Sequence, residues 1–141
     1  MNAEWRDDLA TGNETIDNQH KELFRRIDSL LLSAEERKNR TEVENLLLFL
    51  IDYVKIHFSD EEALQLQHAY PLYKEHREEH DIFIRKLMQA ADQFYTEESP
   101  HTVNVIAGNM ALQWLLNHIY KSDKKMAEYV NSKLMRGSIG T

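Results

Sequence analysis

The sequence has no cysteine, and this absence removes several classes of metal and redox site at once. Disulfide bonds, iron–sulfur clusters and zinc sites with thiolate ligands all require cysteine sulfur. Any metal that this chain binds must therefore be held by the nitrogen and oxygen atoms of other side chains.

Basic residues and long apolar runs are also scarce. The chain has 17 Lys and Arg against 24 Asp and Glu, a formal net charge of −7, whereas a nucleic-acid or anionic-membrane surface needs clustered basic residues. No apolar run approaches the roughly 18 residues of a membrane span, and the first residues lack the basic and apolar regions of a signal peptide. We therefore expect a cytoplasmic protein with no nucleic-acid partner and no membrane insertion.

Glycine and proline, which usually interrupt regular structure, number only 4 and 2 among 141 residues. Apolar residues recur at steps of three and four, which is the period of an α-helix with one buried face. We predict an all-α protein, one domain over residues 1–141, folded as an up-down-up-down antiparallel four-helix bundle. The expected elements are an N-terminal arm at 1–13 that contains Trp5 and helices at about 14–34, 41–67, 71–95 and 101–131.

Four residues carry specific signals about the helices. Thr41 and Glu44 match the capping box Thr-x-x-Glu, so we expect the second helix to begin near Thr41. Pro71 suits the first turn of the third helix, where its missing N–H is not needed. Gly108 lies inside the fourth expected helix, where glycine costs about 1 kcal/mol relative to alanine, and we interpret it as a close approach between helices.

Five histidines and two carboxylates are spread over all four expected helices. His57 and Glu61 are four residues apart, as are His76 and His80, and side chains at this spacing on one helix can reach a common point. Because the helices alternate in direction, sites halfway along each of them can meet at one level inside the bundle. The candidate metal ligands are His20, His57, Glu61, His76, His80, His118 and Asp123.

The number of candidate ligands exceeds the six positions of one octahedral ion, so a shared site predicts two metal ions. If both carboxylates bridge, the side chains supply five nitrogens and four oxygens. A bridging oxo or hydroxo group adds two contacts, which makes eleven of the twelve positions that two octahedra require. One position then stays open for a small molecule.

The spacing of His118 and Asp123 predicts a local irregularity in the fourth helix. Residues five apart on an ideal α-helix point about 140° apart, so both side chains cannot face the core of a regular helix. A single π-type turn would bring them together, and we predict one there.

In this order and at these spacings, the residues resemble the motifs of the hemerythrin family, specifically its small single-domain bacteriohemerythrins, over nearly the whole chain. A lone His-x-x-x-His is weakly specific, but the complete set is strongly specific. The resemblance rests on Trp5, the run Ile16-Asp-Asn-Gln-His20, His57-Phe58 with Glu61-Glu62, Tyr70-Pro71, His76-x-x-x-His80, and Trp114-Leu-Leu-Asn-His118-Ile119 with Asp123.

The resemblance implies a non-haem centre of two iron ions with a bridging oxo or hydroxo group, which binds dioxygen reversibly. One iron would be held by His76, His80 and His118, and the other by His20 and His57. Glu61 and Asp123 would bridge them, and dioxygen would bind the iron that has two histidines. Apolar residues that match the family's pocket positions, and that would exclude water, are Leu23, Phe58, Trp114, Leu115 and Ile119; ordinary core packing is their simpler role.

Gln65, one turn after Glu61, departs from the family, which usually has an apolar residue such as Met or Leu at this position. If its side chain points inward, the amide brings a polar group near the dioxygen pocket and can speed autoxidation by admitting water. If it points outward, no effect follows.

Several other polar residues have simpler interpretations. We interpret Glu62, Glu78 and Glu79 as a solvated helix face, with Glu62 as the one that could lie near the cluster. His68 and His101 are too far along their helices from His57 and His118 to share the site, so we expect both at the surface.

We expect a dioxygen-binding protein for transport, storage or scavenging, and not an enzyme. The alternatives are a di-iron enzyme that acts on peroxide or nitric oxide, including weak oxidase or peroxidase activity, and a sensor of oxygen or iron. A metal-free structural bundle is disfavoured because five buried histidines without ligation would leave many polar atoms unsatisfied. Besides dioxygen, the expected partners are an oxygen-consuming enzyme or a reductase.

Overall fold

The computed structural model describes residues 4–96 and 99–139, and all the regular secondary structure within them is helical. Some helical segments are 3-10 and one is a π-helix. The elements are η1 (Asp7–Leu9), α1 (Glu14–Glu35), α2 (Arg40–Gln67), α3 (Tyr73–Asp92), η2 (Gln93–Tyr95), α4 (Pro100–His118), the π-helical η3 (Ile119–Asp123) and α5 (Lys124–Ile139).

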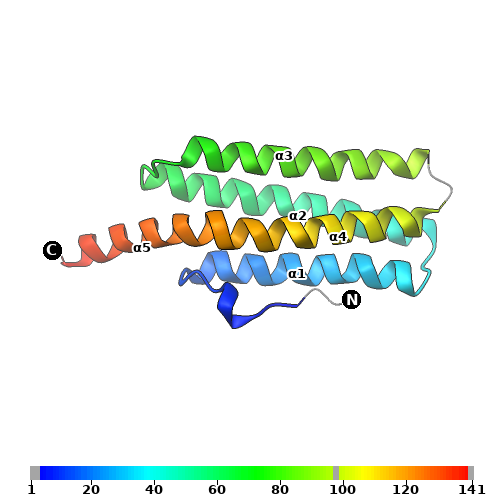
Figure 1. Ribbon diagram of the computed structural model, residues 1–141, viewed down its shortest axis with the longest axis horizontal. Coiled ribbons are helices and arrows are strands. Elements are labelled where there is room, and N and C mark those ends of the chain that lie inside the picture. The colour runs from blue at the N-terminus through cyan, green and yellow to red at the C-terminus, as the bar shows by residue number, and fades with distance from the viewer. Residues whose placement is uncertain (1–3, 97–98, 140–141) are drawn as a thin grey trace.

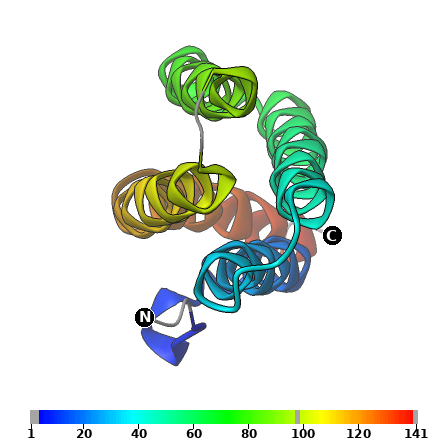
Figure 2. The same ribbon diagram turned by 90° about the vertical axis from the view of Figure 1, so that its right-hand side faces the viewer.

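The helices form an antiparallel four-helix bundle (Figure 1). Successive helices run in opposite directions, and α4, η3 and α5 make one continuous rod that serves as the last of the four. Seen end-on, the rods surround a common centre and the N-terminal arm lies beside α1 (Figure 2). Helix α1 packs on α2 and α4, and α3 packs on the same two helices. The predicted all-α, up-down-up-down architecture is confirmed.

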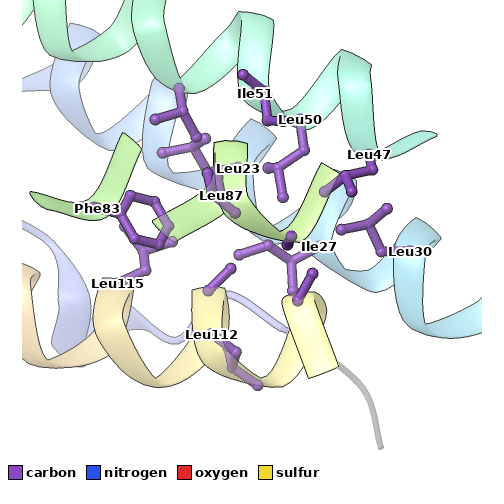
Figure 3. Packing of buried hydrophobic residues seen from close by; sticks show 14 of the residues in the cluster. Leu23, Ile27, Leu30, Leu47, Leu50, Ile51, Phe83, Leu87, Leu112 and Leu115 are labelled. Carbon is purple, nitrogen blue, oxygen red and sulfur yellow. The ribbon is translucent and has the colours of Figure 1, made fainter. Parts of the chain in front are cut away.

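The apolar faces of all four rods meet in one core, which Figure 3 shows from close by. Burial of each large aliphatic side chain contributes about 1.5–3 kcal/mol, so this layer supplies much of the stability of the bundle. The labelled side chains are Leu23, Ile27 and Leu30 of α1, Leu47, Leu50 and Ile51 of α2, Phe83 and Leu87 of α3, and Leu112 and Leu115 of α4.

A smaller apolar cluster lies toward the start of α1 and contains Ile16, Tyr70, Met126, Ala127 and Val130. Along α1, His20 lies between Ile16 of this small cluster and Leu23 of the main core. The candidate metal ligands therefore occupy a polar layer between two apolar clusters. This arrangement keeps the layer dry, since all seven candidates are at most 4% exposed.

Two expected helix starts are wrong by one or two residues. The N-cap of α2 is Asn39, whose side-chain oxygen accepts a hydrogen bond from the backbone N–H of Glu42 at 3.0 Å, so Thr41 lies inside the helix. Asparagine caps at least as well as threonine, and this cap comes first along the chain. Pro71 belongs to the turn before α3, because Leu72 has φ −101° and ψ 20° and the helix begins at Tyr73.

Other boundaries also differ from the expected ones. Helix α3 ends at Asp92, and η2 continues it for one 3-10 turn to Tyr95. The last rod continues to Ile139, beyond the expected end at 131. The predicted π-type turn is confirmed, because η3 spans Ile119–Asp123.

The N-terminal arm packs on α1 through two apolar side chains. Trp5 meets Phe24 edge-on, with ring centroids 6.3 Å apart, and Leu9 is fully buried. Residues 1–3 of the expected arm lie outside the described residues. Among the residues that are described, no helix combines the length and apolar character that crossing a membrane requires.

The expected close approach at Gly108 is also confirmed. A Cβ atom at this buried position of α4 would lie 2.8 Å from Cδ2 of Leu31 on α1. Glycine therefore lets α4 and α1 pack closely in the part of the bundle away from the ligand layer.

Candidate metal centre

Every rod of the bundle contributes to the ligand layer. Helix α1 provides His20, α2 provides His57 and Glu61, and α3 provides His76 and His80. The last rod provides His118 at the end of α4 and Asp123 at the end of η3. The structure brings all seven residues together in two overlapping groups, within each of which the candidate ligand atoms lie within 4.8 Å of one another.

The three-histidine group consists of His76, His80 and His118 with Glu61 and Asp123. The Nε2 atom of His118 lies 3.0 Å from Nε2 of His76 and 3.1 Å from Nε2 of His80. Glu61 Oε1 is 3.2 Å from Nε2 of His76 and also 3.2 Å from Nε2 of His80. Asp123 Oδ1 is 3.1 Å from Nε2 of His76 and 3.0 Å from Nε2 of His118.

The two-histidine group consists of His20 and His57 with the same two carboxylates. Glu61 Oε2 lies 3.0 Å from Nε2 of His57 and 3.5 Å from Nε2 of His20. Asp123 Oδ2 lies 2.8 Å from Nε2 of His20. Each carboxylate thus directs one oxygen to each group, which is the arrangement of a carboxylate that bridges two metal ions.

The separations between ligand atoms fit metal coordination. With metal–ligand bonds of about 2.1 Å, two ligands at right angles are about 3 Å apart, and the Nε2–Nε2 distances of 3.0 and 3.1 Å match this spacing. Several buried atoms of the layer, including Nε2 of His20 and of His57 and both oxygens of Asp123, lie close to other ligand atoms but have no hydrogen-bond partner of suitable geometry among the described residues. Unsatisfied buried polar atoms that converge on one point fit a shared metal ion.

The charges in this layer stabilise one another strongly. Burial disfavours protonated His20 and His76, but their contacts with Asp123 and Glu61 outweigh it and raise the pKa of each to about 9.

The pKa values of His118, Glu61 and Asp123 also shift in the directions expected from their neighbours. Burial also opposes protonation of His118, and the charge of Asp123 raises its pKa to about 10. The surrounding histidines hold the pKa of Glu61 and of Asp123 well below their usual range despite full burial. A divalent ion would take the place of these protons, because the same nitrogens and oxygens can bind either.

The histidine side chains are oriented by hydrogen bonds at their outer nitrogen atoms. The Nδ1–H of His57 donates to Oε1 of Gln19 at 2.7 Å. The Nδ1–H of His80 donates to Oε2 of Glu62 at 2.9 Å. The Nδ1–H of His118 donates to Oε2 of Glu79, also at 2.9 Å. In the neutral form of each ring these bonds hold the proton on Nδ1, so that Nε2 can direct a lone pair at the centre.

The interpretation of Glu79 as solvated helix face is therefore wrong. Its carboxylate is about half exposed but accepts from both His118 and the hydroxyl of Ser122, and the bond with His118 lowers the pKa of Glu79 to about 2. Glu62 does lie next to the centre, whereas Glu78 is exposed.

A sequence signal for these outer partners existed. Gln19 directly precedes His20, Glu62 directly follows Glu61, and Glu79 directly precedes His80. Each partner is thus next to one ligand in the sequence and hydrogen-bonds a different one.

The π-helical segment explains how His118 and Asp123 serve one centre. The extra residue in this turn brings side chains five apart onto one face. Both residues are buried, and their ligand atoms lie 3.0 Å apart.

Comparison with known proteins identifies the family. The model of the hemerythrin HHE cation binding domain matches residues 11–130. The chain belongs to the hemerythrin family. It is 34% identical to a bacteriohemerythrin of Pseudomonas paraeruginosa over 91% of this chain and 79% of that protein, and 34% identical to one of Methylococcus capsulatus over 83% and 87%. A crystal structure of wild-type hemerythrin superposes with a TM-score of 0.81 at 31% identity, covering 89% of this chain and 95% of the other.

The five apolar residues that were expected to line a pocket are either stacked on ligand histidines or buried in the core. Phe58 stacks on His80 with ring centroids 3.7 Å apart, and Trp114 stacks on His118 at 4.3 Å. Leu23, Leu115 and Ile119 are buried in the main apolar core.

The remaining polar residues lie either in the core or away from the ligand groups. Gln65 points inward, because its side chain is fully buried. His68 is the C-cap residue directly after α2, and His101 bonds through Nε2 to the carbonyl oxygen of Lys38 at 2.6 Å. Both are partly buried and lie outside the two ligand groups of this hemerythrin-family protein.

Proposed function

We propose that this protein is a cytoplasmic dioxygen-binding protein that holds two iron ions, one in each histidine group, with an oxo or hydroxo bridge between them. The observation that carries the proposal is the division of the carboxylate oxygens. Oε1 of Glu61 and Oδ1 of Asp123 face the three-histidine group, and Oε2 and Oδ2 face the two-histidine group. When bound, the two irons would supply reversible electron transfer to dioxygen.

The two groups offer different numbers of protein ligands. The three-histidine group has three nitrogens and two oxygens, whereas the two-histidine group has two nitrogens and two oxygens. One shared bridge would complete six-coordination in the first group and leave one position open in the second. We therefore assign dioxygen binding to the side of His20 and His57.

The residues around the ligands favour binding over turnover. Leu23, Phe58, Leu115 and Ile119 are at most 2% exposed, and none of these four side chains carries a proton donor. Their apolar packing limits the access of water and of external reductants to the centre. This supports transport, storage or scavenging of dioxygen as the role, with an oxygen-consuming enzyme or a reductase as the proposed partner.

The deciding experiment is anaerobic loading with ferrous iron followed by titration with dioxygen. We expect about two irons per chain and a visible absorption band that appears with dioxygen and disappears under vacuum. Irreversible oxidation with consumption of added peroxide or nitric oxide would indicate an enzyme instead. Reversible binding coupled to a change in the protein's association with another protein would indicate a sensor, and fewer than one iron per chain would contradict the proposal.

A further inference from the structure

The outer nitrogen atoms of His20 and His76 have no hydrogen-bond partner among the described residues, and of these two only that of His20 is fully buried. Gln19, Glu62 and Glu79 accept from the Nδ1 atoms of His57, His80 and His118. The Nδ1 atom of His20 is fully buried and has no hydrogen-bond partner among the described residues. A ligating histidine almost always donates its outer N–H, because that bond fixes the tautomer and the ring orientation.

The buried side-chain amide of Gln65 also lacks hydrogen-bond partners among the described residues. The side chain is 0% exposed, and neither its amide oxygen nor its amide nitrogen has a hydrogen-bond partner in residues 4–96 and 99–139. Such a group is costly to bury, since it gives up its bonds to water and gains none in return. Native proteins rarely leave both atoms of a buried amide unpaired.

The helix geometry brings these two side chains together. Gln65 is one turn beyond Glu61 on the same face of α2, and Glu61 Oε2 lies 3.5 Å from Nε2 of His20. Because α1 and α2 run antiparallel (Figure 1), one turn forward on α2 from the level of His20 corresponds to one turn back on α1, at Ile16. Side chains on helices lean toward the N-terminus of their own helix. His20 therefore leans toward the level of Ile16, and Gln65 leans back toward Glu61, so both enter the same layer.

We propose that Gln65 is the positioning residue of His20, and that its amide oxygen receives the Nδ1–H hydrogen bond through one trapped water molecule. A buried water typically makes about three hydrogen bonds to polar groups that otherwise lack partners. Here it would accept from Nδ1–H of His20 and donate to Oε1 of Gln65. The bond holds the His20 ring so that Nε2 faces the centre. This inference rests on the proposed function, since it assigns a role at the same metal centre.

The first test measures iron release from the reduced, iron-loaded protein to a ferrous chelator under anaerobic conditions. We expect Gln65→Leu and the similarly sized Gln65→Met to release one of the irons about tenfold faster than wild type, the lower end of the range for lost outer partners. Gln65→Glu keeps an acceptor oxygen and should restore the wild-type rate. The control Asn104→Leu removes another buried amide, one that bonds Ser33 and the carbonyl of Val43 in α1 and α2. It should lower stability to urea without changing iron release.

The rate of iron release, compared with the urea stability of the iron-free protein, separates positioning from simple packing. An amide that only occupies core volume would be replaced by leucine with equal or greater stability to urea and no change in iron release. A positioning residue would show equal or greater stability together with faster release. Unchanged release in both Gln65→Leu and Gln65→Met would overturn the inference.

The second test uses the zinc-loaded protein with nitrogen-15 in its histidine rings. We expect a slowly exchanging Nδ1–H signal for His20 that is shifted or lost in Gln65→Leu, while the Nδ1–H signals of His57, His80 and His118 stay in place. An unaffected His20 signal would contradict the assignment. If the wild type binds zinc but takes up no iron, the proposed function fails, whereas this spectrum still decides the role of Gln65.

Discussion

The three-histidine and two-histidine groups share both carboxylates but differ in the hydrogen bonds behind their ligands. His80 and His118 donate to carboxylates, those of Glu62 and Glu79. His57 donates instead to the neutral amide of Gln19. A carboxylate acceptor makes an imidazole a stronger donor to a metal than an amide does. In a metal-loaded protein, Glu62 and Glu79 would therefore stabilise a more positively charged ion in the three-histidine group than Gln19 would in the other group.

The two groups also differ in how accessible they are from the surface. A pocket of about 220 Å³ reaches His76, and another of about 150 Å³ reaches His118; Glu79, Lys121 and Ser122 line both. His20 and His57 are 0% exposed. The group with the proposed open position is thus the more deeply enclosed one, which suits a site that admits a small uncharged molecule and excludes water.

We expect the largest effect from removing a carboxylate that the two groups share. Glu61→Ala deletes one oxygen from each group and leaves the buried histidines without a compensating charge. We expect iron uptake to fall from about two per chain to below one, measured by metal analysis after anaerobic loading. Asp52→Ala, an exposed substitution on the same helix, is the control and should keep full uptake. Full uptake by Glu61→Ala would show that the carboxylate does not bridge.

Removing one histidine from each group compares the groups directly. His57→Ala leaves three protein ligands in its group, whereas His80→Ala leaves four. We expect both variants to lose metal affinity, and His57→Ala to lose at least tenfold more, as measured by competition with a ferrous chelator. Equal losses would mean that the two groups bind metal equally well.

The pH dependence of the iron-free protein follows from the raised histidine pKa values. His20 and His76 have pKa values of about 9 and His118 of about 10, above the usual value of 6.5. The folded protein therefore retains these protons longer than the unfolded chain does. Their contribution to stability is complete below about pH 6.5 and is lost as the pH rises through 9 to 10. The lowered pKa values of Glu61 and Asp123 make the opposite contribution, which is present above their usual values and is lost as the pH falls.

Urea unfolding of the iron-free protein between pH 4 and pH 10 would check this dependence. Metal binding at pH 7 must displace the same protons, so iron affinity should rise with pH. His76 and His118 belong to one group and His20 to the other, so we expect the three-histidine group to release more protons on binding. Metal binding without proton release would contradict this assignment.

Exchanging the outer partners tests the charge difference between the groups. Glu79→Gln keeps an acceptor for His118 but removes its negative charge. We expect the reduction potential of the iron in the three-histidine group to rise by on the order of 60 mV, a tenfold shift toward the ferrous form. Gln19→Glu should lower the potential of the other iron by a similar amount. Spectroelectrochemical titration measures both, and potentials that do not move would remove the proposed asymmetry.

The smallest expected effect lies outside both groups. Ala69 follows α2 with φ 52°, in a turn closed by the bond from Tyr70 N–H to the carbonyl of Gln65. Left-handed backbone costs a non-glycine residue about 1 kcal/mol, so Ala69→Gly should stabilise the protein by about that amount in urea unfolding. Iron uptake should not change. A loss of stability would show that the flexibility which glycine adds to the unfolded chain outweighs the relief of strain.

The sequence was sufficient for the main features of the fold and the site, because both depend on helical periodicity. Pairs four residues apart, such as His57 with Glu61, must share a helix face, and the spacing of five between His118 and Asp123 required the π-helical turn that the structure contains. The helix starts were less predictable. Asn39 and Thr41 are both good caps, and only the backbone conformation selects between them.

The outer partners could not be predicted from periodicity. Glu79 is about half exposed, as expected of an ordinary surface residue. Its carboxylate nevertheless accepts a hydrogen bond from His118, which lies on a neighbouring helix. Whether the side chain of Gln65 points inward could not be predicted either, because a position one helical turn beyond a ligand faces the core in some rotations of the helix and not in others. Such contacts depend on the angle and offset between helices, which single-helix spacing does not contain.

The sequence by itself determined a cysteine-free, acidic four-helix bundle with seven candidate nitrogen and oxygen ligands for metal, because spacing along a helix sets which side chains share a face. Only the tertiary structure decided which carboxylate oxygen faces which group, and which side chains accept from the outer nitrogens of His57, His80 and His118. These features arise between helices, where packing sets the distance and orientation of residues far apart in the chain.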